Sequence, residues 1–484
     1  MKKPNLLFLY TDEQAIDTLA AYGNTQIEMP NLNKLSDESS VFEQAYVTQP
    51  VCTPSRSSLL TGLYPHNNGC TSNNIPLKKE TKCFPELLDD SDYQTGHFGK
   101  WHLGDELFNQ HGFDQWIGTE AGYQGFYSEG LDRNTKSDYC KFLINNGFQP
   151  KNCRFFTRGE SAHFSEEFSK PAFLAEESKR FIEEHKDSPF ALFVNFLEPH
   201  SPFYGPRDNQ YNPDDIPLPS NFNHKLDENN PLKTKFFAHI FNKHGISGID
   251  LSTEEGWKRL RANYWGLCSL VDKYVGEIID KLKECGLYDD TIIVFTSDHG
   301  DMMGSHRLVA KCVMFEEATR VPFFVKLNGQ NEAKKIKGPV SQIDIIPTLL
   351  DIMGKDVPEN LDGASLKELA VNGGKVPENN NVFIEWTGTN GGGTRRDIPE
   401  CLKEKVPDLN TLEKYLGDEV RTVVCPDGWK YNWSPIGEDE LYNLNEDSGE
   451  INNLAFDSSQ KDRIVEMRQK IRAWKIKTSD NNAI

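Results

Sequence analysis

A short segment near the start of the chain places a cysteine where a reactive anion is favoured. Cys52 is followed by Pro54 and, four positions on, by Arg56, which can share its face of a helix. Proline suits a first helical turn, and the pattern predicts a short helix over residues 55–61 that stops at Gly62. Cys52 would lie just before the helix start, where free N–H groups and the helix dipole attract negative charge. A buried structural cysteine beside a surface arginine is the alternative.

Acidic residues follow two strongly apolar runs of the sequence. Asp12 and Glu13 come after the first run, and Asp298 and His299 come after a later one. If both runs are neighbouring strands, their carboxyl ends meet where ligands gather in open α/β sheets. Oxygen-rich ligand sets favour calcium or magnesium over zinc. These four residues therefore predict a divalent-cation site, and a turn or helix-cap role for Asp12 is the alternative.

Four further residues have the charge or proton chemistry that an anionic substrate needs. Lys100 and His102 follow an extended segment two positions apart, which predicts that they point to the same face of a strand. Lysine supplies a point charge and histidine titrates near neutral pH. His200 lies between prolines on a restricted loop, which suits a general acid. Taken alone, each has an ordinary alternative: a solvated surface pair, a structural loop histidine and, for Lys311, a surface lysine.

These residues require a scaffold of strands and helices. Apolar runs predict buried parallel strands over residues 6–10, 190–197, 292–296 and 322–326. The stretches between and after them predict helices over residues 30–40, 171–186, 253–285 and 345–353. Strands that alternate with helices indicate an α/β fold in which helices cover both faces of the sheet.

A second unit is predicted at the carboxyl end. The composition becomes polar and loop-like around residues 372–381, so we expect a catalytic domain over 1–375 and a smaller subdomain over 376–484. Residues 420–426 and 429–433 flank Asp427 and Gly428, a strong hairpin signal. A final amphipathic helix is expected over residues 459–476.

Two long segments, residues 117–169 and 203–252, are rich in Gly, Asn, Pro and aromatic residues without a clear period. Irregular segments of this length are often binding loops. We therefore expect both to wall a ligand pocket, and partly ordered surface decoration is the alternative.

The composition limits the partners of the protein. The chain has 484 residues and a formal net charge of −20, which argues against nucleic acid and anionic membranes. Ten cysteines without a C-x-x-C pair predict reduced, buried thiols.

No apolar run approaches the roughly 18–20 residues of a membrane span. The first run is too short for a signal-peptide core. We expect a cytoplasmic protein, or a periplasmic or secreted one whose leader has been removed.

Taken in order, these motifs resemble the type I, formylglycine-dependent sulfatases of the alkaline phosphatase superfamily. The similarity spans the chain and includes Cys-Thr-Pro-Ser-Arg (52–56), Leu-Thr-Gly-Leu-Tyr-Pro-His (60–66), Gly-Lys-Trp-His-Leu-Gly (99–104), Pro-His-Ser-Pro (199–202), Ser-Asp-His-Gly-Asp (297–301), Arg-Val-Pro (320–322) and Asp-Glu-Leu-Tyr-Asn-Leu (439–444). The resemblance implies an α/β fold with a large, mostly parallel central sheet flanked by helices. It also implies a smaller C-terminal α+β subdomain that carries an antiparallel sheet.

The resemblance implies a metal site around an oxidised cysteine. Asp12, Asp298 and His299 match metal ligands, and formylglycine made from Cys52 would complete the shell. Glu13 falls where the family usually carries a second aspartate, and the flexible oxygen shell of calcium could accept its longer side chain. The implied cofactors are Ca²⁺, with Mg²⁺ possible, and the formylglycine itself.

The same resemblance assigns catalytic roles. Arg56 and Lys100 would hold the aldehyde hydrate and the sulfate, and His102 would accept a hydrogen bond from the hydrate and help it collapse. His200 and Lys311 would bind the scissile ester oxygen and assist its departure. Two residues are expected only to support the site: His66 and Arg320.

The implied reaction is hydrolysis of a sulfate ester with release of inorganic sulfate. The implied partners are a formylglycine-generating maturation enzyme and a sulfated small molecule or saccharide. A carbohydrate is favoured because aromatic residues in and near the first insertion suit sugar rings, although such residues also pack in cores: Trp116, Tyr123, Phe126 and Tyr127. Two alternatives stay open, a phosphonate monoester or phosphodiester hydrolase of the same superfamily and a non-catalytic binder of sulfated glycan.

Overall fold

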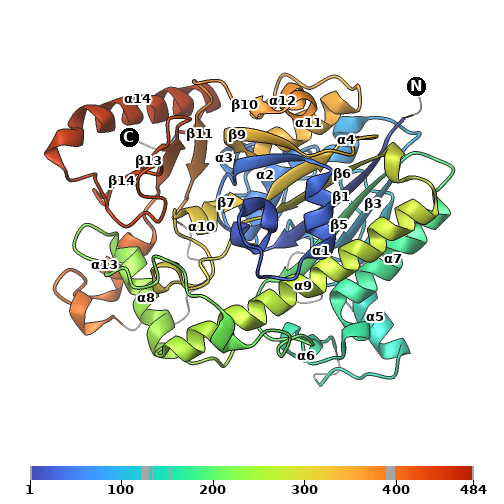
Figure 1. Ribbon diagram of the computed structural model, residues 1–484, viewed down its shortest axis with the longest axis horizontal. Helices are drawn as coiled ribbons and strands as arrows, with labels where there is room; N and C mark the ends of the chain where they lie inside the picture. The colour runs from blue at the N-terminus through green and yellow to red at the C-terminus, as the bar shows by residue number, and fades with distance from the viewer. Residues whose placement is uncertain (1–2, 121–129, 133, 152–153, 389–397, 482–484) are drawn as a thin grey trace.

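The structure is a computed structural model that describes residues 3–120, 130–132, 134–151, 154–388 and 398–481. In this part of the chain, ten strands form one sheet in the order β10-β9-β2-β8-β6-β1-β5-β3-β4, and β7 pairs with β2 (Figure 1). Most neighbouring pairs are parallel. The strands of this sheet are β1 Asn5–Asp12, β2 Ser40–Tyr46, β3 Gln94–Gly99, β4 Gln115–Gly118, β5 Phe190–Pro199, β6 Thr291–Ser297, β7 Arg320–Val321, β8 Phe323–Lys326, β9 Lys334–Ser341 and β10 Gly374–Lys375.

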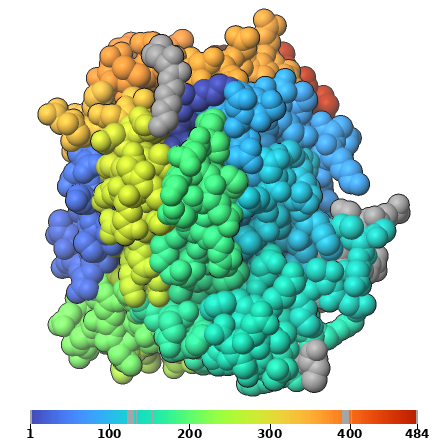
Figure 2. All heavy atoms as spheres, turned by 90° about the vertical axis from the view of Figure 1, so that its right-hand side faces the viewer, coloured from blue at the N-terminus to red at the C-terminus, as the bar shows by residue number. Residues whose placement is uncertain are grey.

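Helices cover both faces of this sheet, as predicted. The described α-helices are α1 Pro30–Asp37, α2 Cys52–Thr61, α3 Pro65–Asn68, α4 Phe84–Leu88, α5 Asp138–Asn145, α6 Arg158–Ser161, α7 Lys170–Glu184, α8 Leu232–His244, α9 Glu254–Glu284, α10 Glu316–Thr319, α11 Ile345–Ile352, α12 Lys367–Asn372, α13 Leu409–Leu416 and α14 Lys461–Thr478. Figure 2 shows the yellow end of α9 beside the green end of α7 on one side of the molecule.

The central strand β1 separates two apolar cores. Leu7 and Leu9 pack with α1, α7 and α9, whereas Leu6 and Phe8 pack with α2, α4 and α11 on the opposite face. Successive strand residues point to opposite faces, so a strand buried on both sides must be apolar at every position. The continuous apolar run at the start of the chain is therefore this strand.

One predicted strand runs in the opposite direction from the one expected. The apolar run 322–326 was predicted to be parallel, but β8 pairs antiparallel with β6 and with β2. The connection from β6 contains the short helix α10 and returns to the sheet close to where β6 ends, so β8 must run back. The predicted helix over 30–40 also ends early, at Asp37, because Ser40 already begins β2.

A second, antiparallel sheet lies at the carboxyl end, in the order β11-β12-β13-β14. Its strands are β11 Val382–Glu385, β12 Arg421–Val424, β13 Trp429–Trp433 and β14 Glu440–Asn443. The predicted hairpin is confirmed, and Gly428 in its turn has a φ of 89°, which favours glycine. The predicted domain boundary at residues 375–376 falls between β10 of the large sheet and β11 of the small one, and the division into two domains stays a prediction.

The composition predicted buried, reduced thiols and no membrane-spanning segment. The cysteines whose surroundings are described are free thiols and, apart from the half-buried Cys285, they are buried. Among the helices of the described ranges, none combines the length and the apolar character needed to cross a membrane.

Candidate functional site

The sheet brings the two acidic motifs together. Strands β1 and β6 are parallel neighbours, and Thr11 pairs with Ser297 in their register. Asp12, the last residue of β1, and Asp298, the residue after β6, therefore lie at the same carboxyl edge of the sheet. The backbone N–H of Asp298 donates to the Thr11 carbonyl at 3.1 Å, which ties the two strand ends together.

Helix α2 brings Cys52 to this edge. The helix begins at Cys52 itself rather than just after it, because Val51 is extended and its carbonyl accepts from the Ser55 N–H at 3.1 Å. Gly62 ends the helix with a φ of 70°, as predicted. Cys52 thus occupies the first turn, where free N–H groups and the helix dipole favour negative charge.

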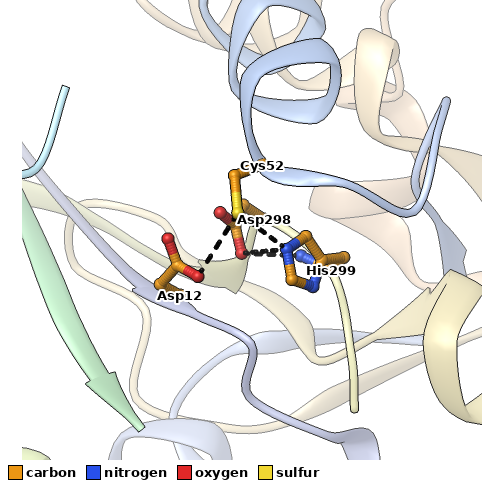
Figure 3. A group of neighbouring side chains, drawn as sticks. All are labelled: Asp12, Cys52, Asp298 and His299. Carbon is orange, nitrogen blue, oxygen red and sulfur yellow. Dashed lines mark hydrogen bonds and ion pairs between the residues drawn. The ribbon is translucent and has the colours of Figure 1, made fainter. Parts of the chain in front are cut away.

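Four side chains converge here in a buried cluster (Figure 3). One ligand atom from each of Asp12, Cys52, Asp298 and His299 lies within 4.8 Å of all the others. His299 Nε2 is 3.3 Å from Cys52 Sγ and 3.6 Å from an Asp298 carboxylate oxygen. These four residues, which we call the acidic cluster, are 0–2% exposed.

The acidic cluster fits a divalent cation. His299 Nδ1 donates to the Gly300 carbonyl at 2.9 Å, and because a carbonyl can only accept, the proton is on Nδ1. Its Nε2 therefore presents a lone pair to the cluster, which is the arrangement that metal-binding histidines use. Two carboxylates and a neutral imidazole around one point form a donor set suited to a cation.

Arg56 bridges the two aspartates of the acidic cluster, Asp12 and Asp298. Its Nη2 lies 2.8 Å from Asp12 Oδ2 and its Nε lies 2.8 Å from Asp298 Oδ2, and it is fully buried. Lys100 also pairs with Asp12 Oδ2. Burial by itself raises the pKa of Asp12, but Lys100 and Arg56 hold that pKa well below its usual value.

Lys100 and His102 do not share a strand face, so that prediction is wrong. Strand β3 ends at Gly99, and His102 has a left-handed φ of 59°. The Glu106 carboxylate accepts from the Trp101 N–H at 2.9 Å and the His102 N–H at 2.6 Å, which holds this turn. Burial, and then Lys100, keep the pKa of His102 well below its usual value.

Sequence reasoning missed two residues that orient His102. Besides Glu106, Asn74 places Oδ1 3.0 Å from His102 Nε2. The backbone carbonyl of His102 accepts from the Thr53 hydroxyl at 2.7 Å, which links the histidine to the helix that carries Cys52. No local pattern marks Asn74 or Glu106, because their importance comes from contacts across the loop.

His200 and Lys311 reach the cluster from other loops. His200 Nε2 lies 4.0 Å from Asp12 Oδ1, and Lys311 Nζ lies 2.9 Å from Glu13 Oε1. Burial, and then Lys311, keep the pKa of His200 well below its usual value, which favours the neutral ring. Glu13 is outside the acidic cluster, because its carboxylate meets Lys311 and His200. A second possible cation group contains Asp12, Glu13 and His200.

The thiol of Cys52 is poorly suited to act as it stands. Burial and the nearby Asp12 carboxylate raise its pKa to about 11, against the opposing effect of Lys100 and Lys311. The thiolate is the nucleophilic form of cysteine, so an unmodified thiol here is largely unreactive at neutral pH.

The two supporting residues lie outside the cluster. His66 Nδ1 is 2.5 Å from Glu385 Oε2, and its Nε2 is 3.2 Å from the Thr478 carbonyl in α14. Arg320 donates to the Glu43 carbonyl at 2.7 Å and 3.1 Å. Both therefore connect structural elements.

Both predicted insertions contribute to the surroundings of His200. A cavity beside this histidine is lined by Arg158 and Ser161 from the first insertion and by Tyr204 from the second. Trp116 does not line it, because its ring stacks on His97 with centroids 4.3 Å apart. Three other predicted sugar-binding aromatics lie outside the described residues: Tyr123, Phe126 and Tyr127.

Comparison with known proteins places this chain in a family. The sequence model of the Sulfatase family matches residues 4–355. An arylsulfatase of Clostridium perfringens is 29% identical over 96% of this chain and 93% of that protein. An N-acetylglucosamine-6-O-sulfatase of Bacteroides thetaiotaomicron is 25% identical over 99% of this chain and 88% of that protein.

The fold has known counterparts as well. The structure of a phosphonate monoester hydrolase from Silicibacter pomeroyi superposes with a TM-score of 0.77 at 22% identity and covers 99% of this chain and 96% of that one. This likeness shows that the two proteins share the fold with a large, mostly parallel sheet. Because the family match extends over well more than half of the sequence, the chain belongs to the sulfatase family and is a sulfuric ester hydrolase.

Proposed function

We propose that this protein releases inorganic sulfate from a sulfated carbohydrate, with a formylglycine made from Cys52 and a bound divalent cation, calcium or magnesium. The observation that supports this most directly is the acidic cluster, in which Asp12, Asp298 and His299 surround Cys52 within 4.8 Å. Arg56 and Lys100 add two buried cations beside it, which supplies the positive charge that a sulfate needs inside an acidic protein.

Asp12, Asp298 and His299 would hold the cation together with residue 52. When bound, the cation lowers the pKa of a hydroxyl on the oxidised side chain and neutralises sulfate oxygens. The oxidised residue supplies two hydroxyls on one carbon, one to attack sulfur and one to expel sulfate afterwards. Arg56 and Lys100 oppose the negative charge that develops on the sulfate oxygens in the transition state.

His200 is the proposed general acid. Its Nδ1 donates to the Ser201 carbonyl at 2.8 Å, which leaves Nε2 as the nitrogen that faces Asp12 and Glu13. To act as the acid, the ring must also carry a proton on Nε2, between Asp12 and Glu13; this imidazolium delivers that proton to the departing alcohol while Lys311 binds the scissile ester oxygen. His102, oriented by Asn74, is proposed to accept a proton from the second hydroxyl when sulfate leaves.

The proposed substrate is a sulfated saccharide. The Bacteroides thetaiotaomicron relative is named for a 6-O-sulfated sugar, and it aligns along nearly the whole of this chain. The cavity beside His200 carries charged groups and hydroxyls, including Arg158, Ser161 and Tyr204, that can contact a hydroxyl-rich leaving group. A maturation enzyme that oxidises Cys52 is a required partner.

The test combines mass and activity. Conversion of Cys52 to the aldehyde lowers the mass of its peptide by about 18 Da. Wild type is expected to show this shift and to release sulfate from 4-nitrophenyl sulfate and from members of a panel of sulfated mono- and disaccharides. Cys52→Ser lacks the second hydroxyl, so it should stop after at most one turnover while it keeps the fold. Steady multiple turnovers by this variant would contradict the proposed mechanism.

The same assay separates the alternatives. Phenyl phosphonate esters are assayed in parallel, and faster hydrolysis of these than of any sulfate would favour a phosphonate monoester hydrolase. An unshifted mass from a host with an active maturation system, together with tight binding of sulfated glycan, would favour a non-catalytic binder.

A further inference from the structure

Glu13 departs from the usual family pattern, and its backbone explains where its side chain goes. It follows β1 with a left-handed φ of 71°, a conformation that few non-glycine residues adopt. Its N–H donates to Asp298 Oδ1 at 3.0 Å and its carbonyl accepts from the Tyr264 hydroxyl at 2.7 Å. The strand end is thereby fixed in a turn, and the side chains of Asp12 and Glu13 meet different partners.

The Glu13 carboxylate lies between two other functional side chains. Oε1 accepts from Lys311 Nζ at 2.9 Å, and Oε2 lies 3.5 Å from His200 Nε2. The residue is 1% exposed, and within the described ranges Oε2 accepts no hydrogen bond. Besides Lys311 and His200, the buried Asp301 carboxyl is a neighbour of the Glu13 carboxyl.

Lys311 depends on this carboxylate for its position. It lies between Ala310 and Cys312, which have φ values of 64° and 74°, so the loop bends sharply on both sides of it. The loop is fastened by the Cys312 N–H, which donates to the Pro50 carbonyl at 3.2 Å, close to Cys52. A lysine ammonium stands on a flexible four-carbon stem. The ion pair between Lys311 Nζ and Glu13 Oε1, at 2.9 Å, therefore selects one direction for the ammonium.

We propose that Glu13 is a positioning residue, which holds Lys311 Nζ and His200 Nε2 at the side of the site where the alcohol leaves, rather than a ligand of the cation. This inference rests on the proposed function, in which those two residues assist the departing oxygen. Poor leaving groups need that assistance more than good ones do. The rate effect of changing Glu13 should therefore grow as the leaving group becomes more basic.

The experiment compares Glu13→Gln, Glu13→Asp, Lys311→Ala and the double variant Glu13→Gln/Lys311→Ala, with the exposed Glu359→Gln as a matched control. Each is assayed on aryl sulfates of graded leaving-group pKa and on one alkyl sulfate. General acid–base assistance contributes roughly 100- to 10,000-fold. We expect Glu13→Gln to lose about tenfold in kcat/KM with the best leaving group and about a hundredfold or more with the poorest.

A double-mutant cycle tests whether Glu13 acts through Lys311. Residues that act as a unit have non-additive effects. The loss in the double variant should therefore be smaller than the product of the two single losses, because without Lys311 the change at Glu13 can act only through His200. Glu13→Asp, which keeps the charge, should recover part of the loss. Losses that multiply in the double variant would overturn the inference.

Calcium binding provides a readout that does not depend on turnover. Titration of Ca²⁺ alone into chelator-treated protein should give the same affinity for wild type and Glu13→Gln. A tenfold or greater loss of calcium affinity, with equal rate losses for all leaving groups, would make Glu13 a ligand. Failure of the proposed function would be seen separately, because wild type would then cleave phosphonate esters but not sulfate esters. In that case Glu13→Gln should show the same dependence on the leaving group with phenyl phosphonates.

Discussion

Replacing Arg56 with alanine should destabilise the protein more than most single changes. The guanidinium is fully buried and donates to Asp12 and to Asp298, each at 2.8 Å, and to the Lys100 carbonyl at 2.9 Å. It also lies over the Tyr10 ring, 4.9 Å from the centroid. Removal leaves two fully buried carboxylates, and of these Lys100 pairs with Asp12.

The magnitude follows from burial. Removing one partner of a buried ion pair costs about 3–5 kcal/mol. Because Arg56 serves two buried carboxylates, we expect the upper end, about 5 kcal/mol of unfolding free energy, when no cation is bound. Unfolding entropy of about 2.1 cal/mol/K per residue gives roughly 1 kcal/mol/K for 484 residues. The melting temperature would then fall by only about 5 °C, so denaturant unfolding is the better measurement.

The assay is urea unfolding of wild type and Arg56→Ala in the presence of a chelator, and again with excess calcium. Calcium should narrow the difference, because a cation between the two aspartates replaces part of the lost positive charge. Arg180→Ala is the matched control, since the Arg180 side chain is 62% exposed and its pair with Glu177 should contribute less than about 1 kcal/mol. A chelated Arg56→Ala within about 1 kcal/mol of wild type would refute the reasoning from burial.

Two further predictions concern the cation and pH. Calcium at 100 times its dissociation constant should raise the unfolding free energy by about 2.7 kcal/mol. Asp298→Asn should remove most of this increase. An unchanged calcium dependence of the unfolding free energy in that variant would contradict the assigned ligands. Burial disfavours a charged His66, but the Glu385 carboxylate outweighs it and raises the pKa of His66. A raised pKa in the folded state gives stability that is complete below the unfolded value of about 6.5 and is lost as pH rises through the folded value. The difference in unfolding free energy between wild type and His66→Gln should therefore shrink from pH 5.5 to pH 8.5, and a difference that grows with pH would count against it.

The order of elements and the identity of the family could be predicted from the sequence. Strands buried on both faces must be apolar throughout, so β1, β5 and β6 appear as runs that local patterns reveal. Parallel strands end at a common edge, so an acid at the end of β1 and another just after β6 must be neighbours, and the meeting of Asp12 and Asp298 could be anticipated from the sequence. The hairpin at Gly428 is also a local property, because it depends on two turn residues.

Other features depended on the tertiary structure. The direction of β8 is set by where the preceding loop returns, which no periodicity records. The turn at His102 is held by Glu106 and Asn74, residues without a recognisable motif.

The clearest case is Glu13. Its sequence position, next to Asp12, matches a metal ligand, but its carboxylate meets Lys311, which lies 298 positions away along the chain. The sequence by itself determined which residues carry charge and which strands they follow. Only the tertiary structure decided which charges meet, because ion pairs between distant segments depend on how loops return to the sheet and not on local spacing.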